Sequence, residues 1–118
     1  MNRLELPASQ WVSYGLARLR VLQHPLARSE ACDAPRQLLD SAEVLGFPRD
    51  EPCPVCGRNT LWGVYWVFGS ELGERSGTAR AASEIETLVQ QGIPVEVHEV
   101  EVCASCGWNY LLRSAQLN

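Results

Sequence analysis

The chain has 118 residues, the length of one domain, and its content of 46% apolar and 20% charged residues excludes wholesale disorder. Its longest strongly apolar run covers residues 61–69, which is too short for a membrane-spanning helix of about 20 residues. Residues 51–118 hold four arginines and eight acids, and this net charge of −4 disfavours non-specific binding of the C-terminal half to a phosphate backbone.

The N-terminal segment, residues 1–50, is predicted to be helical. Its first residues lack the basic-then-apolar order of a secretory signal, so we expect a cytoplasmic protein. A first helix is predicted over residues 10–23, with apolar residues at helical spacing at Val12, Leu16, Leu19 and Leu22. A second helix follows Asp33, its candidate N-cap, and ends at Gly46. We expect these two helices to form a hydrophobic lid.

A short helical turn at residues 28–32 would make three consecutive helices, so residues 28–45 also admit a helix-turn-helix. The second helix of that motif would carry Asp40 and Glu43, which would face phosphates unfavourably. The arginines best placed for nucleic acid are Arg18, Arg20 and Arg28, because no acid lies between residues 6 and 29. A nucleic-acid-binding regulator that uses these arginines is the alternative function.

Residues 60–69 are rich in aromatic and β-branched residues and predict a strand. Both of its alternating faces are apolar, so the strand should be covered on both sides. Any uncovered part would form a surface for a partner. The candidate partner surface comprises Trp62, Trp66, Phe68, Trp108, Arg18, Arg20 and Arg28.

A short helix is predicted after this strand. Residues 70–82 form a loop rich in glycine and serine. Ser83 and Glu86 then have the spacing of a capping box and open a helix at residues 84–91, which Gly92 ends.

Two further strands are predicted, over residues 94–102 and 108–113. In the first of them, the valines occupy odd positions up to Val97 but even positions from Val100 onward. Because side chains alternate with a period of two along a strand, we predict a β-bulge near His98–Glu99.

Four of the five cysteines form two copies of one motif, Cys53-Pro-Val-Cys56-Gly57 and Cys103-Ala-Ser-Cys106-Gly107. A Cys-x-x-Cys turn places two sulfurs close enough to share a metal ion, and the following glycine tolerates a positive φ. Two such turns complete a tetrahedral site, so we expect one structural Zn²⁺ held by Cys53, Cys56, Cys103 and Cys106. A closed site of this kind leaves no position for water or substrate, so it stabilises the fold and does not catalyse.

Other chemistries remain open for these residues. Iron is the main alternative metal, because the first motif also resembles a rubredoxin turn, although 46 residues separate the two pairs. A redox pair fits less well because neither motif follows a βαβ pattern, and a reducing cytosol disfavours disulfides. We expect Cys32 to be a buried apolar side chain, His24 to lie at a helix end, and His98 to lie at the surface.

Together these elements predict an α+β fold. An N-terminal segment of two to three helices, residues 1–50, is expected to pack on a C-terminal zinc-ribbon antiparallel sheet, residues 51–118. The short helix at residues 84–91 is inserted between the two halves of that sheet, and both parts should form one compact unit.

With these residues in place, the chain resembles a family of small actinobacterial proteins of uncharacterised function. The resemblance extends from about residue 11 to the end of the chain. It rests on the ordered motifs Cys32-Asp33-Ala34, Cys53-Pro54-Val55-Cys56, Trp66-Val67-Phe68-Gly69, Leu72-Gly73, Ser76-Gly77, Val100-Glu101-Val102-Cys103 and Cys106-Gly107-Trp108-Asn109. It implies a zinc-binding cytoplasmic protein and supplies no catalytic role.

The sequence predicts a non-catalytic protein. No motif such as Gly-x-Ser-x-Gly organises a nucleophile, an acid and a base. The four Trp and three Tyr residues are of the kinds that dominate protein interfaces. We therefore expect an adapter that binds another protein or, by analogy with other zinc ribbons, a transcription or translation assembly.

Overall fold

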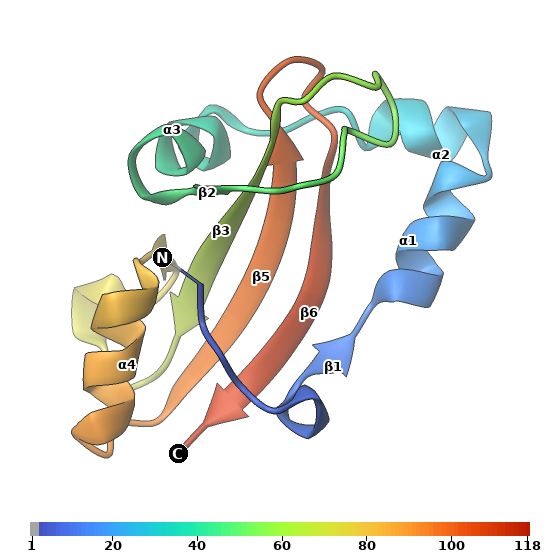
Figure 1. The fold of residues 1–118 in the computed structure, drawn as a ribbon. Coiled ribbons are helices and arrows are strands. Elements are labelled where there is room, and N and C mark those ends of the chain that lie inside the picture. Colours follow the sequence, from blue (N-terminus) through green and yellow to red (C-terminus); the bar gives the residue numbers. More distant parts are fainter. Residues whose placement is uncertain (1–2) are drawn as a thin grey trace.

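The protein folds around one antiparallel sheet, and the computed structural model describes residues 3–118. The three long strands are β3 (Leu61–Phe68), β5 (Val95–Cys103) and β6 (Asn109–Leu117), with β5 in the middle (Figure 1). Short strands extend the sheet: β1 (Val12–Ser13) pairs with β6, whereas β2 (Phe47–Pro48) and β4 (Thr78–Ala79) pair with β3. This mixture of helices and antiparallel strands agrees with the predicted α+β class.

The helices are α1 (Gly15–Leu22), α2 (Pro25–Glu30), α3 (Arg36–Leu45) and α4 (Ala82–Gln90), with single 3-10 turns at Ala8–Gln10 and Gly73–Arg75. None of the helices in residues 3–118 is long and apolar enough to span a membrane. The first predicted helix starts five residues late, at Gly15, because Val12 and Ser13 join the sheet and the Tyr14 N–H donates to the Leu112 carbonyl at 2.8 Å. The second helix starts at Arg36, directly after Pro35, and Asp33 makes no capping bond.

The predicted capping box of α4 does not form. The helix begins at Ala82 after Ala81, so Ser83 and Glu86 both lie inside it. Gly92 ends the helix as predicted, with a φ of 74° that favours glycine.

Two apolar layers cover opposite faces of the sheet. On one face, Ile85 and Leu88 of α4 pack with Val67 of β3, Val97 of β5 and other buried residues. On the other face, Leu38 and Ala42 of α3 pack on Val64 and Val102. Strand β3 is therefore covered on both sides where α3 lies over it, as its doubly apolar pattern predicts. Because α3 packs on the sheet, it serves as a lid. The first helix does not match this prediction, since α1 has no fully buried residue and leaves Leu16 and Leu19 exposed.

The irregularity near His98–Glu99 lies in the neighbouring strand. Strand β5 pairs with β3 without interruption from Glu96 to Cys103. Its pairing with β6 shifts between Glu99 and Val100, where Leu112 of β6 is the extra residue. The bulge therefore lies at the predicted position, but its extra residue belongs to β6 and not to β5. The valines move from odd to even positions along β5 because Glu99 and Glu101 occupy its buried odd positions. These two glutamates are 2% and 1% exposed.

Candidate metal centre

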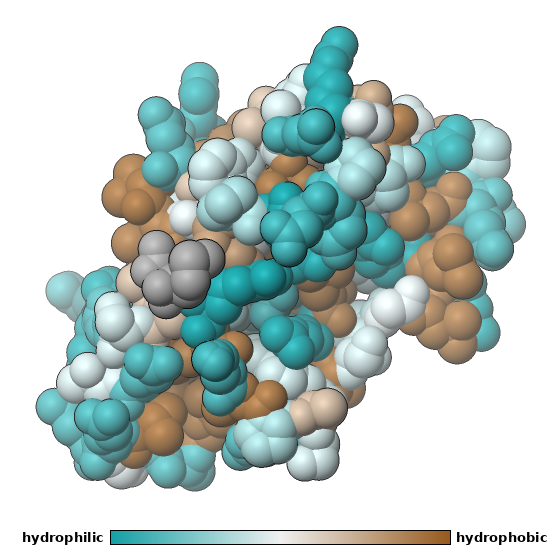
Figure 2. Space-filling model, viewed as in Figure 1, coloured by the Kyte–Doolittle hydropathy of each residue, from teal (hydrophilic) through white to brown (hydrophobic). Residues whose placement is uncertain are grey.

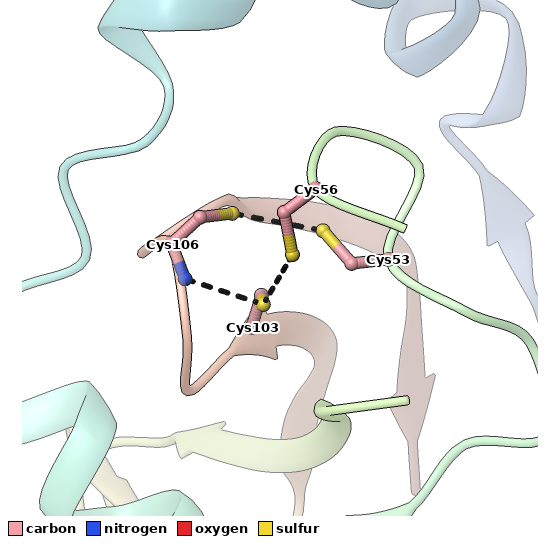
Figure 3. A group of neighbouring side chains, drawn as sticks. All are labelled: Cys53, Cys56, Cys103 and Cys106. Carbon is pink, nitrogen blue, oxygen red and sulfur yellow. Dashed lines mark hydrogen bonds between the residues drawn. The ribbon is translucent and has the colours of Figure 1, made fainter. Parts of the chain in front are cut away.

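The two cysteine turns meet at one end of the sheet. The first lies in the connection between β2 and β3, and the second joins β5 to β6. Strands β3 and β5 pair so that Leu61 lies opposite Cys103, which brings the turns together although 46 residues separate the two pairs. Figure 3 shows the four cysteine side chains pointing toward a common centre.

Both turns have the same backbone structure. In each, the glycine N–H donates to the carbonyl of the first cysteine, and the N–H of that cysteine donates to the carbonyl of the residue after the glycine. The distances are 2.9 Å for Gly57 to Cys53, 2.9 Å for Cys53 to Arg58, 3.0 Å for Gly107 to Cys103 and 2.8 Å for Cys103 to Trp108. Gly57 and Gly107 have φ values of 77° and 82°, which explains why both motifs end in glycine.

The sulfur geometry fits four ligands of one ion. The Sγ atoms of Cys53 and Cys106 lie 3.7 Å apart, as do those of Cys56 and Cys103, and all four lie within 4.8 Å of one another. A tetrahedral ion with metal–sulfur bonds of about 2.3 Å would place its ligands about 3.8 Å apart. A disulfide needs about 2.05 Å between its sulfurs, so the four cysteines are not oxidised in pairs.

Hydrogen bonds to the Cys103 sulfur favour its negatively charged thiolate form. Burial alone raises the pKa of the Cys103 thiol, but Thr60 Oγ1 lies 3.1 Å from its Sγ and two backbone N–H groups donate to it, so its pKa falls to about 6. Burial raises the pKa of Cys53 and of Cys106. Because four thiolates within 4.8 Å would repel one another, full deprotonation requires a cation among them.

The donor set fits a metal ion that prefers thiolates, such as zinc or iron. The cluster is also shielded, since Cys53 and Cys103 are buried and Cys56 and Cys106 are half-buried. All four coordination positions of a tetrahedral ion would be filled by protein, so the centre can stabilise the fold but offers no position to a substrate.

The other candidate ligands stay outside the cluster. The Cys32 Sγ donates to the Arg28 carbonyl at 3.4 Å, and this half-buried residue packs beside the cysteine turns as an apolar side chain. His98 contacts Glu96 and packs on the ring of Phe68, with 4.7 Å between ring centroids. His24 is the N-cap of α2 and is exposed.

Two residues of the candidate partner surface are buried or engaged. Trp108 is fully buried, and its Nε1 donates to Glu101 at 2.8 Å, so assigning it to a surface was wrong. Arg18 points inward, where its Nε donates to the same carboxylate at 2.6 Å. The predicted nucleic-acid face therefore lacks one of its three arginines. Arg20 is exposed and Arg28 is half-buried. The remaining residues of the candidate partner surface are also half-buried: Trp62, Trp66 and Phe68.

Sequence reasoning missed a charged cluster beside the metal centre. Arg49 and Arg113 pair with Glu99 at 3.2 and 2.9 Å, and Arg18 pairs with Glu101. These arginines come from α1, from the segment after β2 and from β6, so the two buried glutamates of β5 hold three distant segments together. The signal was present in the sequence, since Glu99 and Glu101 continue the odd, buried positions of Val95 and Val97.

Comparison with known proteins places the chain in a family. The model of DUF5318, a family of unknown function, matches residues 8–118. "Uncharacterized protein Rv0049" of Mycobacterium tuberculosis and "Uncharacterized protein Mb0050" of Mycobacterium bovis are each 45% identical to this chain over 86 residues. The match covers 73% of this chain and 63% of each relative, so it spans less than two thirds of their length. No solved structure matches the chain. The expected membership in an uncharacterised actinobacterial family is thereby confirmed, and the chain belongs to the DUF5318 family.

Proposed function

We propose that this protein is a non-catalytic zinc-ribbon adapter in which one structural Zn²⁺ holds the fold and the surrounding surface binds another protein. The observation that carries the metal assignment is the convergence of four Sγ atoms within 4.8 Å of one another, at separations of 3.7 Å that match the edges of a thiolate tetrahedron.

The ribbon assignment is supported by the strands on either side of each cysteine turn. Strand β2 pairs with β3, with Phe47 opposite Gly63, and the first turn lies in the connection between them. Strand β5 pairs with β6 around the second turn. Each cysteine pair therefore ends a strand–turn–strand unit, and the two units share the pairing of β3 with β5.

The absence of catalysis is inferred from the chemistry of the centre. A zinc ion with four protein thiolates has no open position at which to activate water. Four thiolates and one Zn²⁺ add about −2 to the chain's net charge of −4, which also disfavours an adapter for nucleic acid. A protein partner, in a transcription or translation assembly or elsewhere, fits this charge better.

The metal assignment is tested by native mass spectrometry combined with elemental analysis of the purified chain. We expect one zinc per chain, lost on chelation together with the fold. One iron per chain, with its visible thiolate-to-iron absorption, would replace zinc in the proposal. A folded chain that contains no metal would overturn it.

A further inference from the structure

A groove lies over β6, with α3 on one side and α1 and α2 on the other. It consists of two hollows of about 290 and 500 Å³ that share Asn109 and Leu111, and we call them together the β6 groove. Their combined size is that of a ligand pocket, about 300–1,000 Å³. Val21 of α1 lines the groove, whereas Leu16 and Leu19 lie on the outer side of that helix, over which Figure 2 shows a brown patch at the right.

The half of the β6 groove beside α3 is apolar. Its walls include Leu38 of α3, Trp66 of β3, Val100 of β5 and Leu111 of β6, and none of the described residues that line it is charged. Trp66, Val100 and Leu111 are half-buried, so α3 leaves this part of the sheet partly open to solvent. An apolar side chain that entered here would remove this surface from water.

The half of the β6 groove beside α1 and α2 is acidic and aromatic. It is lined by the carboxylates of Glu30 and Asp33 and by the side chains of Tyr14 and Tyr110. Both acids are exposed, and neither forms a salt bridge within residues 3–118. Carboxylates and aromatic rings in one hollow suit a cationic group, because both attract positive charge.

The nearby basic residues do not line this groove. Arg18 turns away to the opposite face of the sheet, where it pairs with Glu101. The exposed Arg36 pairs with Asp40 on the outer side of α3. Arg28 of α2 is half-buried, and neither Arg28 nor Arg36 is part of either hollow. The groove therefore presents two carboxylates in a chain whose net charge is already −4.

The acidic half of the groove is held in place by the second cysteine turn. Asn109 follows that turn, and its backbone N–H donates to the Ala31 carbonyl at 3.1 Å. The Nδ2 of Asn109 donates to Asp33 Oδ1, also at 3.1 Å. Tyr110 stacks on the buried Trp108, with 5.8 Å between ring centroids. The metal centre therefore supports one wall of the groove.

We propose that the β6 groove binds a segment of a partner protein in which an arginine or lysine lies next to an apolar side chain. The cationic group would lie between the carboxylates of Glu30 and Asp33 and beside Tyr110. The neighbouring apolar side chain would cover Trp66 and Leu111. This inference deepens the proposed adapter function and rests on it, since it names the class of segment that the adapter recognises.

The composition of the groove separates this partner from other occupants. A nucleic acid or an anionic membrane carries phosphates, which the two carboxylates repel. A second copy of the chain would bring another net charge of −4 against the first. A small cation would fill the acidic half but would leave the apolar half in contact with water. A protein segment with both kinds of side chain uses both halves.

The proposal is tested with random heptapeptides displayed on phage and selected on the immobilised, metal-loaded full chain. Enriched peptides are synthesised, their dissociation constants are measured by isothermal titration calorimetry, and amide NMR spectra of the chain locate the bound peptide. Glu30→Arg reverses one charge in the groove. Glu86→Arg is the matched control, because Glu86 is an exposed acid of α4, on the opposite face of the sheet. Metal content and circular dichroism are measured for each variant.

We expect enriched peptides in which arginine or lysine is next to an apolar residue, and amide shifts that change at Asn109, Tyr110 and Leu111 when they bind. Glu30→Arg should weaken binding about tenfold or more, because it places like charges together, whereas Glu86→Arg should leave the affinity unchanged. Asp33→Asn should also weaken binding, since it removes the charge but keeps an oxygen that can accept from Asn109.

No enriched peptide, enriched peptides without a basic residue, or equal affinities for Glu30→Arg and Glu86→Arg would overturn the proposal. A dimer in native mass spectra that Glu30→Arg dissociates would place a second copy in the groove and would also overturn it. A peptide that shifts amides elsewhere on the surface would leave the adapter function standing but reject this groove. A folded, metal-free chain would instead reject the proposed function itself.

Discussion

The indole Nε1 of Trp108 donates to Oε2 of Glu101 at 2.8 Å, and both side chains are buried, at 0% and 1% exposure. The same oxygen accepts the Nε–H of Arg18 at 2.6 Å. One buried carboxylate oxygen therefore joins the second cysteine turn, the centre of the sheet and the first helix. This explains why a charged residue of α1 faces inward.

Glu101→Gln should destabilise the metal-loaded protein by about 3–5 kcal/mol, because it removes the buried counter-charge of Arg18 and of Arg49, whose Nε lies 3.6 Å from Glu101 Oε1. The free energy of unfolding in urea measures this loss. Asp40→Asn is the matched control, since Asp40 pairs with Arg36 at 4.0 Å on the exposed side of α3 and should contribute less than about 1 kcal/mol. Equal stability of the two variants would mean that the buried pair does not hold α1 in place.

Cys106→Ser should abolish metal binding and unfold the cysteine end of the sheet, because ligation in small zinc domains contributes about 10 kcal/mol or more to folding. Cys32→Ser is the control, since the Cys32 Sγ donates only to the Arg28 carbonyl. We expect Cys32→Ser to keep one metal per chain by native mass spectrometry. Loss of the metal from both variants would place Cys32 among the ligands and contradict the four-cysteine centre.

Gly107→Ala should be more destabilising than Gly57→Ala. Both glycines have positive φ, so each substitution costs about 1 kcal/mol in backbone strain. A Cβ at Gly57 would have no atom within 4 Å, whereas a Cβ at Gly107 would lie 3.1 Å from the Cys32 carbonyl oxygen. That carbonyl cannot move freely, because the neighbouring Ala34 N–H donates to the Gly107 carbonyl at 3.0 Å. Thermal unfolding of the two metal-loaded variants compares the costs, and equal melting temperatures would show that the segment around Cys32 is not held against this turn.

Tyr65→Phe should remove part of the loss of stability at alkaline pH. Burial raises the pKa of Tyr65 above its usual value, although the Leu4 N–H that its hydroxyl accepts at 2.8 Å opposes this shift. A raised pKa in the folded state means that the neutral phenol is favoured there. Its contribution is complete below the usual pKa of about 10 and is lost as the pH rises through the raised value.

The free energies of unfolding of the wild type and Tyr65→Phe are compared at about pH 8 and about pH 11. At the lower pH the variant should be less stable by about 1 kcal/mol, because the Leu4 N–H loses its acceptor. At the higher pH this difference should shrink. A difference that does not change with pH would show that the phenol does not titrate with folding.

Several predictions from sequence succeeded where the cause is local, although the N-caps predicted at Asp33 and Ser83 do not form. The strand over residues 60–69 is β3, and the end of α4 at Gly92 follows from a glycine that adopts a positive φ. The spacing within each Cys-x-x-Cys-Gly motif specifies a turn whose hydrogen bonds all lie within six residues. The packed face of α1 was predicted only in part, because Leu22 packs beside the cysteine turns whereas Leu16 and Leu19 are exposed.

The sequence by itself determined which four cysteines could share an ion and which segments form the long strands, because both depend on repeats within a few residues. Only the tertiary structure decided which charged residues of those elements pair with one another in the interior. Arg18 and Glu101 are 83 residues apart in the chain, and their pairing helps to decide which side of α1 faces the sheet. Val21 and Leu22 pack on that side, whereas Leu16 and Leu19 stay exposed. A carboxylate in the centre of a sheet must have cationic partners, and the fold alone brings those partners together from three separate segments.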